Sequence, residues 1–177
     1  MKRVMSVLAV SAVVLAAAGS LSAQATGAVS GLGAVYGAGK SFLTRAAEQL
    51  PEEHFSFKPT PEVRSFGEIV GHVADANYMF CSTATGETNP KQGSSAETLK
   101  TKAELVQALK DAFAYCDKAY QSLSDAKSVE PITLFGMKTN RLGALAFNAG
   151  HNYEHYGNLV TYMRLKGLTP PSSQRGM

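Results

Sequence analysis

The 177-residue sequence has only two cysteines, no tryptophan and a small excess of positive charge. Two cysteines are too few for a multi-disulfide scaffold or a four-cysteine zinc ribbon. With 17 Lys and Arg against 14 Asp and Glu, the net charge of +3 is too small for a typical nucleic-acid-binding protein, so we expect no nucleic-acid partner. The sequence also lacks a Walker A loop and a Rossmann glycine fingerprint, which removes most support for nucleotide binding. The 45% share of hydrophobic residues is ordinary for a globular protein.

Residues 1–25 have the three-part layout of a secretory signal peptide. A basic start is followed by an uncharged apolar run from Val4 to Ala18, and small residues follow that run. The run is shorter than the ~20 residues that a membrane-spanning helix needs, although an uncleaved N-terminal anchor stays open. We therefore predict an exported protein, periplasmic or secreted, whose domain of residues 26–177 has no stable membrane insertion after cleavage.

Four segments of the mature domain carry apolar residues at helical spacing. Ser65 and Glu68 form a capping box at the start of the second segment, and a similar box begins the third at Thr101. Four helices in one domain indicate an all-α four-helix bundle. One short and two long connections argue against a symmetric up-down arrangement. The predicted helices are residues 32–50, 66–84, 101–123 and 140–166.

The connections are predicted as a loop at 51–64, a polar surface loop at 85–100, and a hairpin or extended crossover at 125–139. Cys81 and Cys116 lie on different predicted helices. A disulfide and two buried free thiols both stay open, since pairing needs the two Cα atoms within about 7 Å.

The four histidines include one pair with a spacing that suits a metal ligand set. His151 and His155 lie four residues apart in the last predicted helix, so their side chains project from one face. A catalytic zinc-type site uses three protein ligands and leaves one position for water or substrate. His72, in the second predicted helix, is the natural third ligand, because a bundle brings two helices together. Neutral imidazoles suit Zn, Ni, Fe or Cu.

The alternative interpretation of the histidine pair is that it belongs to a polar, solvated face of the last helix. Asn148, His151, His155 and Tyr162 lie along one row of the last helix, offset from its apolar stripe. Two better-known metal motifs are excluded. Position 152 is Asn rather than the Glu of an HExxH metalloprotease helix, and no Glu lies three residues before a histidine as in ferritin-like sites.

Two stretches carry a family resemblance: HFSFKPTPEVRSFGEIVGHVADAN (54–77) and NAGHNYEHYGNLVTYMRLKGLTPPSS (148–173). Together with their order, one histidine in the second helix and HxxxH in the fourth, they resemble the DinB-like family of four-helix-bundle proteins, also described as metal-dependent hydrolases. The resemblance covers essentially the whole mature domain. It implies one divalent metal ion, such as Zn, Ni, Fe or Mn, held by His72, His151 and His155. Some relatives resemble thiol-dependent transferases or isomerases.

Other side chains are candidates for a place near the metal. Asp75 follows His72 by one turn and Glu154 precedes His155, so either could orient a ligand or act as a base. The ordinary interpretation of both is a solvated helix carboxylate. Asn148, Tyr153 and Tyr78 are candidates for lining a pocket, and His54 is expected to be structural.

The leading hypothesis is an exported DinB-like protein that binds one divalent metal and acts on an unidentified small molecule, by hydrolysis or thiol-dependent transfer. No nucleophile or general base stands out, so no catalytic residue is named. The alternatives are a non-catalytic metal- or ligand-binding bundle, and a structural bundle with inert histidines. Assembly into a homodimer is a further open alternative.

Overall fold

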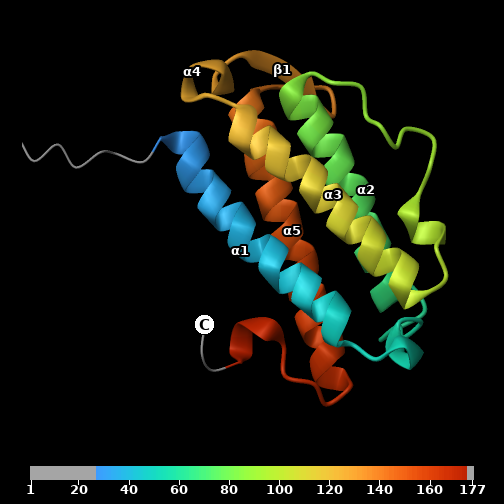
Figure 1. Cartoon of the computed structure of the whole chain (residues 1–177). Helices are drawn as coiled ribbons and strands as arrows, with labels where there is room; N and C mark the ends of the chain where they lie inside the picture. Colours follow the sequence, from blue (N-terminus) through green and yellow to red (C-terminus); the bar gives the residue numbers. More distant parts are fainter. Residues whose placement is uncertain (1–26, 175–177) are drawn as a thin grey trace, which may run out of the picture.

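The computed structural model describes residues 27–174, and the predicted signal peptide at residues 1–25 lies outside them. Within these residues the protein is all-α, with four long helices in one bundle (Figure 1). A short helix and a two-stranded hairpin precede the last long helix. The long helices are α1 (Ala28–Gln49), α2 (Phe66–Thr85), α3 (Lys102–Ser122) and α5 (Arg141–Leu165).

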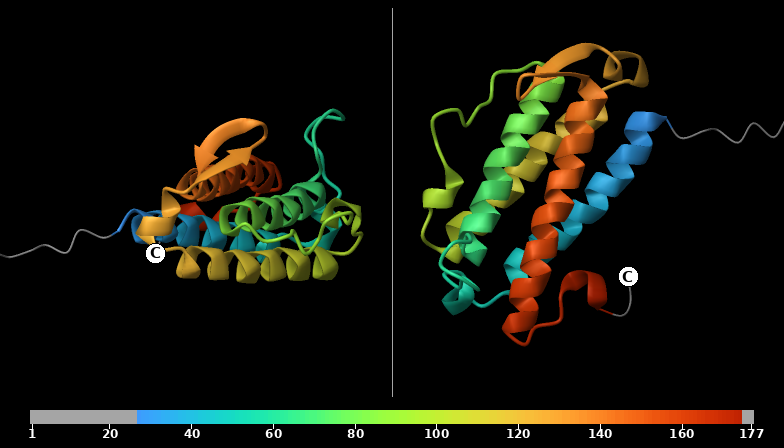
Figure 2. Two further views of the ribbon diagram at one scale, coloured as in Figure 1. Left: turned by 90° about the horizontal axis from the view of Figure 1, so that it is seen from above. Right: turned by 180° about the vertical axis from the view of Figure 1, so that it is seen from behind.

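The helices do not follow a simple up-down order. In Figure 1, α1 and α5 run in one direction and α2 and α3 in the other. Helix α2 packs against both α3 and α5, and α1 packs against the same two helices, as the view from behind in Figure 2 also shows for α5. Because α2 and α3 are parallel neighbours, residues 86–101 must return along the bundle. A 20-residue helix is about 30 Å long, which explains the length of this connection.

The helix starts agree with the sequence pattern at the two capping boxes. The Glu68 backbone N–H donates to Ser65 Oγ over 3.2 Å, and the Ser65 N–H donates to the Glu68 carboxylate over 2.7 Å. Helix α1 begins at Ala28, earlier than predicted despite its glycines. Asp125 accepts a hydrogen bond of 2.9 Å from the Val29 N–H and so satisfies one exposed donor of the first turn.

The connection before α5 contains a hairpin, which is one of the two predicted alternatives. Helix α4 (Asp125–Ser128) leads into strands β1 (Pro131–Leu134) and β2 (Met137–Asn140), which pair antiparallel with Leu134 opposite Met137. The two turn residues, Phe135 and Gly136, have φ angles of 51° and 77°. A two-residue turn with positive φ at both positions, the mirror image of a type I turn, matches the twist of the strands. A bulky Phe in the left-handed region is nevertheless unusual.

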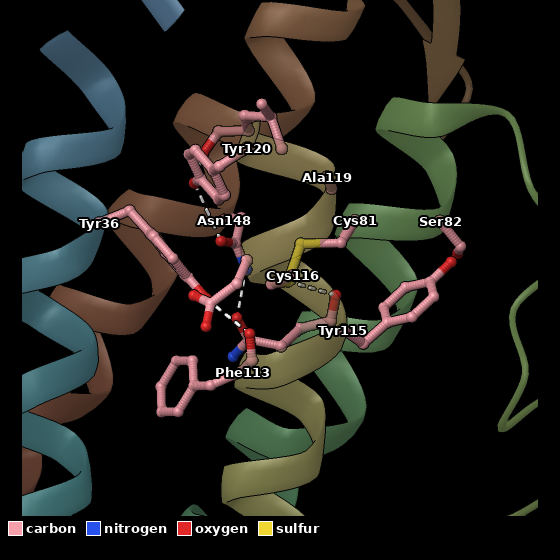
Figure 3. Close-up of a disulfide and its surroundings, with 12 residues drawn as sticks. Tyr36, Cys81, Ser82, Phe113, Tyr115, Cys116, Ala119, Tyr120 and Asn148 are labelled. Carbon is pink, nitrogen blue, oxygen red and sulfur yellow. Dashed lines mark hydrogen bonds between the residues drawn. A yellow bond between two sulfur atoms is a disulfide. The ribbon is translucent and has the colours of Figure 1, made fainter. Parts of the chain in front are cut away.

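Cys81 and Cys116 form a disulfide between α2 and α3, with their Cα atoms 5.3 Å apart (Figure 3). Both residues are fully buried in the core, and because their sulfurs are bonded to each other the alternative of two free thiols is wrong. Phe66, Phe80 and Phe113 are among the largest side chains of the same core.

Within residues 27–174, none of the helices is both long enough and apolar enough to span a membrane.

Candidate metal centre

Three imidazole rings meet between α2 and α5. The candidate ligand atoms of His72, His151 and His155 lie within 4.8 Å of one another. Nε2 of His151 is 3.2 Å from Nε2 of His72 and 3.1 Å from Nε2 of His155. Nitrogens bound tetrahedrally at 2.0–2.1 Å to one zinc ion would be about 3.3 Å apart. The structure thus brings together the three residues that the sequence singled out, and two of the three nitrogen separations fit ligands of one divalent metal ion.

A buried asparagine cluster sets the rotation of α5 relative to α2. Asn77 of α2 donates through Nδ2 to Asn152 over 2.9 Å and accepts at Oδ1 from Asn148 over 2.8 Å. All three side chains are fully buried. Asn148 and Asn152 lie one turn apart on α5 and flank His151 in the sequence. These hydrogen bonds therefore turn the histidine face of α5 toward α2.

The cluster extends to α3 through the hydroxyl of Tyr120. This hydroxyl lies 3.0 Å from Asn148 Oδ1 (Figure 3) and 2.8 Å from the carbonyl oxygen of Leu145. Asn148 is fully buried and His155 is only 8% exposed. The interpretation of this polar row of α5 as a solvated helix face is therefore wrong.

The environment favours uncharged imidazoles. Burial, reinforced by the neighbouring His155 and His72, lowers the pKa of His151 to about 4. Burial and then His72 also lower the pKa of His155. Both rings are therefore neutral at pH 7, the form in which histidine binds a metal.

The outer ring nitrogens have three different environments. Nδ1 of His72 donates to the Glu97 carboxylate over 2.9 Å. Nδ1 of His155 lies 3.3 Å from the side-chain amide of Asn158. Nδ1 of His151 is buried and has no hydrogen-bond partner within residues 27–174.

The two carboxylates that were candidates for a place near the metal, Asp75 and Glu154, have other positions. Asp75 accepts from the Ser95 hydroxyl over 2.8 Å and from the Ala96 N–H over 3.0 Å, so it anchors the 86–100 connection. Glu154 is exposed. The carboxylate that does contact a ring is Glu97, which the sequence analysis missed. It lies 25 residues after His72 in a polar connection, and no motif links the two positions.

A cavity of about 600 Å³ adjoins His155 between α5 and the segment before α2. Arg64 and Tyr162 contribute to its wall. Its size suits a small molecule. The remaining lining residues are Pro59, Thr60, Glu62, Val63, Ile69, Asn158 and Thr161.

The other side of the centre is aromatic. The ring of Phe80 packs edge-on to His151, with centroids 5.4 Å apart. Phe135 and Phe147 cover Phe80 and are themselves 59% and 44% exposed. The centre thus adjoins a mixed polar cavity at His155 and an apolar cluster at His151.

The other candidate residues lie elsewhere. Tyr78 and Asp75 line a separate cavity of about 570 Å³, which none of the three histidines lines. The Tyr153 hydroxyl donates to the Val35 carbonyl of α1 over 3.2 Å. His54 lies in η1 (Glu52–His54), outside the histidine group.

The bundle and the histidine centre define a class to which this chain belongs: it is a member of the DinB superfamily, whose sequence profile matches residues 40–159. Among individual proteins, the chain is similar to the uncharacterized protein YjoA of Bacillus subtilis (strain 168). The two are 26% identical over 137 residues, which cover 73% of this chain and 85% of YjoA.

Solved structures show the same fold. A DinB-like protein from Bacillus cereus ATCC 10987 superposes with a TM-score of 0.70 at 18% identity, covering 80% of this chain and 94% of that one. YjoA of B. subtilis superposes at 0.65 and 23% identity, over 82% of this chain and 99% of its own. A mycothiol-dependent maleylpyruvate isomerase gives 0.61 at 20% identity, over 74% of this chain and 60% of that one.

Proposed function

We propose that this protein binds one divalent metal ion through His72, His151 and His155 and acts on a small molecule in the adjoining cavity. The observation that carries the proposal is the convergence of three Nε2 atoms from two helices, with the separations of 3.1 and 3.2 Å given above. Neutral, mostly buried imidazoles suit Zn, Ni, Fe or Cu.

Metal analysis of protein purified without a histidine tag tests this proposal. We expect about one equivalent of metal in the wild type and a large loss in a His151→Ala, His155→Ala double variant. His54→Ala is the matched control, since His54 is a histidine outside the group. A double variant that binds as much metal as the wild type would overturn the site.

A bound metal would polarise a substrate oxygen or activate water. The residues around the ion would contribute in different ways. The three imidazoles fix the ion, and the cavity beside His155 admits the substrate. The Phe80 wall limits the access of water. Hydrolysis and thiol-dependent transfer are the two reactions we propose, and the fold shared with a mycothiol-dependent isomerase supports the second.

Turnover separates an enzyme from a binding protein. The experiment is a panel of ester, amide and thiol-transfer substrates, assayed with the metal-loaded wild type and with a triple alanine variant of the three histidines. Turnover in the wild type alone supports catalysis. A non-catalytic metal- or ligand-binding bundle is the second candidate, because Glu97 is engaged with His72 and Arg64, and Asp75 with Ser95.

We also propose that the protein is exported. The signal-peptide pattern of residues 1–25 supports export, and so does the disulfide, because disulfides persist mainly in oxidising compartments. Cell fractionation with N-terminal sequencing of the mature protein is the test. An intact N-terminus in the cytoplasm, with reduced thiols, would contradict export.

A further inference from the structure

We infer that Glu97 is a positioning residue for the metal centre, acting through His72. The inference rests on the proposed metal site and adds to it a carboxylate from outside the two ligand-bearing helices. Glu97 belongs to η2 (Ala96–Thr98), and its Oε1 lies 2.9 Å from Nδ1 of His72. Both side chains are mostly buried, at 30% and 24% exposure, so solvent competes only partly for this contact.

The contact decides which nitrogen of His72 carries the proton. An ionised carboxylate only accepts hydrogen bonds, so Nδ1 is the donor and the proton resides there. In the neutral ring Nε2 then has a free lone pair, and Nε2 is the atom that faces His151 over 3.2 Å. A negative charge on the far side of the ring also makes the imidazole a stronger metal donor.

The orientation of the Glu97 carboxylate is fixed by a second partner. Arg64 donates through Nε to Oε2 over 2.9 Å, so each carboxylate oxygen has its own short contact. Arg64 also lines the cavity beside His155. The pair Arg64 and Glu97 therefore connects the wall of that cavity to the ring of His72.

The backbone that bears Glu97 is held against α2 through the two residues that precede it, Ser95 and Ala96. Asp75 binds the Ser95 hydroxyl and the Ala96 N–H. At Gly71, the residue before His72, an added Cβ would lie 2.6 Å from the Ala96 carbonyl carbon. Only glycine allows this approach. Two residues of α2, Gly71 and Asp75, thus bring the η2 segment close enough for Glu97 to reach His72.

The experiment compares the wild type with Glu97→Gln, Glu97→Ala and a control, Glu154→Gln. Glu154→Gln removes the same charge from an exposed side chain that makes no hydrogen bond to an imidazole ring within residues 27–174. Zinc affinity is measured by competition with a chromogenic chelator. We expect a loss of roughly 10–100-fold for Glu97→Ala, a smaller loss for Glu97→Gln, which keeps an acceptor, and a change within about twofold for the control.

A second readout needs no metal. Long-range ¹H–¹⁵N NMR of the metal-free protein reports the protonated nitrogen of each histidine. We expect His72 to be protonated at Nδ1 in the wild type and in Glu97→Gln, and to become a mixture of tautomers in Glu97→Ala. If Glu97→Ala does not fold, Glu97→Gln still tests the effect of charge on affinity.

The outcomes distinguish the two proposals. A wild type that binds zinc with no loss in either Glu97 variant would overturn the positioning role and leave the metal site intact. A wild type that binds no zinc would overturn the proposed metal site. An unchanged His72 tautomer in Glu97→Ala would overturn the positioning role independently of zinc.

Discussion

Asn77 on α2 and Asn148 on α5 are joined by a hydrogen bond of 2.8 Å between two fully buried side chains. Burying an amide is favourable only when its donors and acceptors are paired, so this contact permits few alternative rotations of α5. It lies close to the candidate ligands in both helices: His72 precedes Asn77 by five residues and His151 follows Asn148 by three. The arrangement of the metal centre therefore depends on polar contacts inside the core.

Replacement of Asn77 is expected to destabilise the fold. Asn77→Ala leaves buried amide groups of Asn148 and Asn152 without their partner, at a cost of about 2–5 kcal/mol in the free energy of unfolding. Urea denaturation measures this cost. Asn89→Ala, which removes one exposed hydrogen bond from the Lys91 N–H in the surface connection, serves as the control and is expected to cost about 1 kcal/mol or less. Equal effects of the two substitutions would contradict the role of the asparagine cluster.

Removal of the disulfide is expected to lower stability as well. The bond closes a loop with a sequence separation of 35 residues. The loop-closure entropy for this length corresponds to roughly 3–4 kcal/mol. We expect a Cys81→Ala, Cys116→Ala variant to unfold at a lower denaturant concentration than the oxidised wild type. Reducing agent should destabilise the wild type and leave the variant unchanged; an unaffected wild type would show that the bond contributes little.

Gly71→Ala is expected to weaken zinc binding although residue 71 contacts no metal. The new methyl group would push the backbone at Ala96 away from α2, and Glu97 would move with it. Gly37→Ala in α1 is the matched control, because its added Cβ meets nothing within 4 Å and alanine favours the helix by about 1 kcal/mol. Zinc titration measures the affinity of both variants, and thermal unfolding measures their stability. Full zinc affinity in Gly71→Ala would show that the connection tolerates the displacement.

The capping box at Ser65 predicts a pH dependence of stability. The backbone hydrogen bond from Ser65, followed by Lys58, lowers the pKa of Glu68 from 4.5 to about 2. A depressed carboxyl pKa contributes stability above pH 4.5 that is lost as the pH falls toward 2. The group is partly exposed, so solvent screening limits the effect to about 1 kcal/mol or less.

The variant Glu68→Gln isolates this contribution, since glutamine keeps the capping hydrogen bonds without a titrating charge. We expect the wild type to be more stable than Glu68→Gln at pH 6 and the difference to shrink by pH 2. Urea denaturation at several pH values measures it. A difference that is constant with pH would show that the ionised carboxylate contributes nothing.

Local signals in the sequence predicted most of the architecture. The capping boxes at Ser65 and Thr101 gave helix starts that the structure confirms, because both partners of a box lie within four residues. The unequal connections correctly argued against an up-down bundle. The start of α1 was predicted too late, since the acceptor that satisfies its Val29 N–H is Asp125, far along the chain.

The sequence by itself determined the helices, the i, i+4 pair of His151 and His155, and their resemblance to a bundle family, because each depends on spacing within a short segment. Only the tertiary structure decided that Cys81 and Cys116 pair, that Asp75 holds a loop, and that Glu97 contacts His72. These contacts join residues at least 20 positions apart in the sequence. Such residues meet because helices pack against one another and connections run along them, and neither leaves a periodic pattern in the sequence.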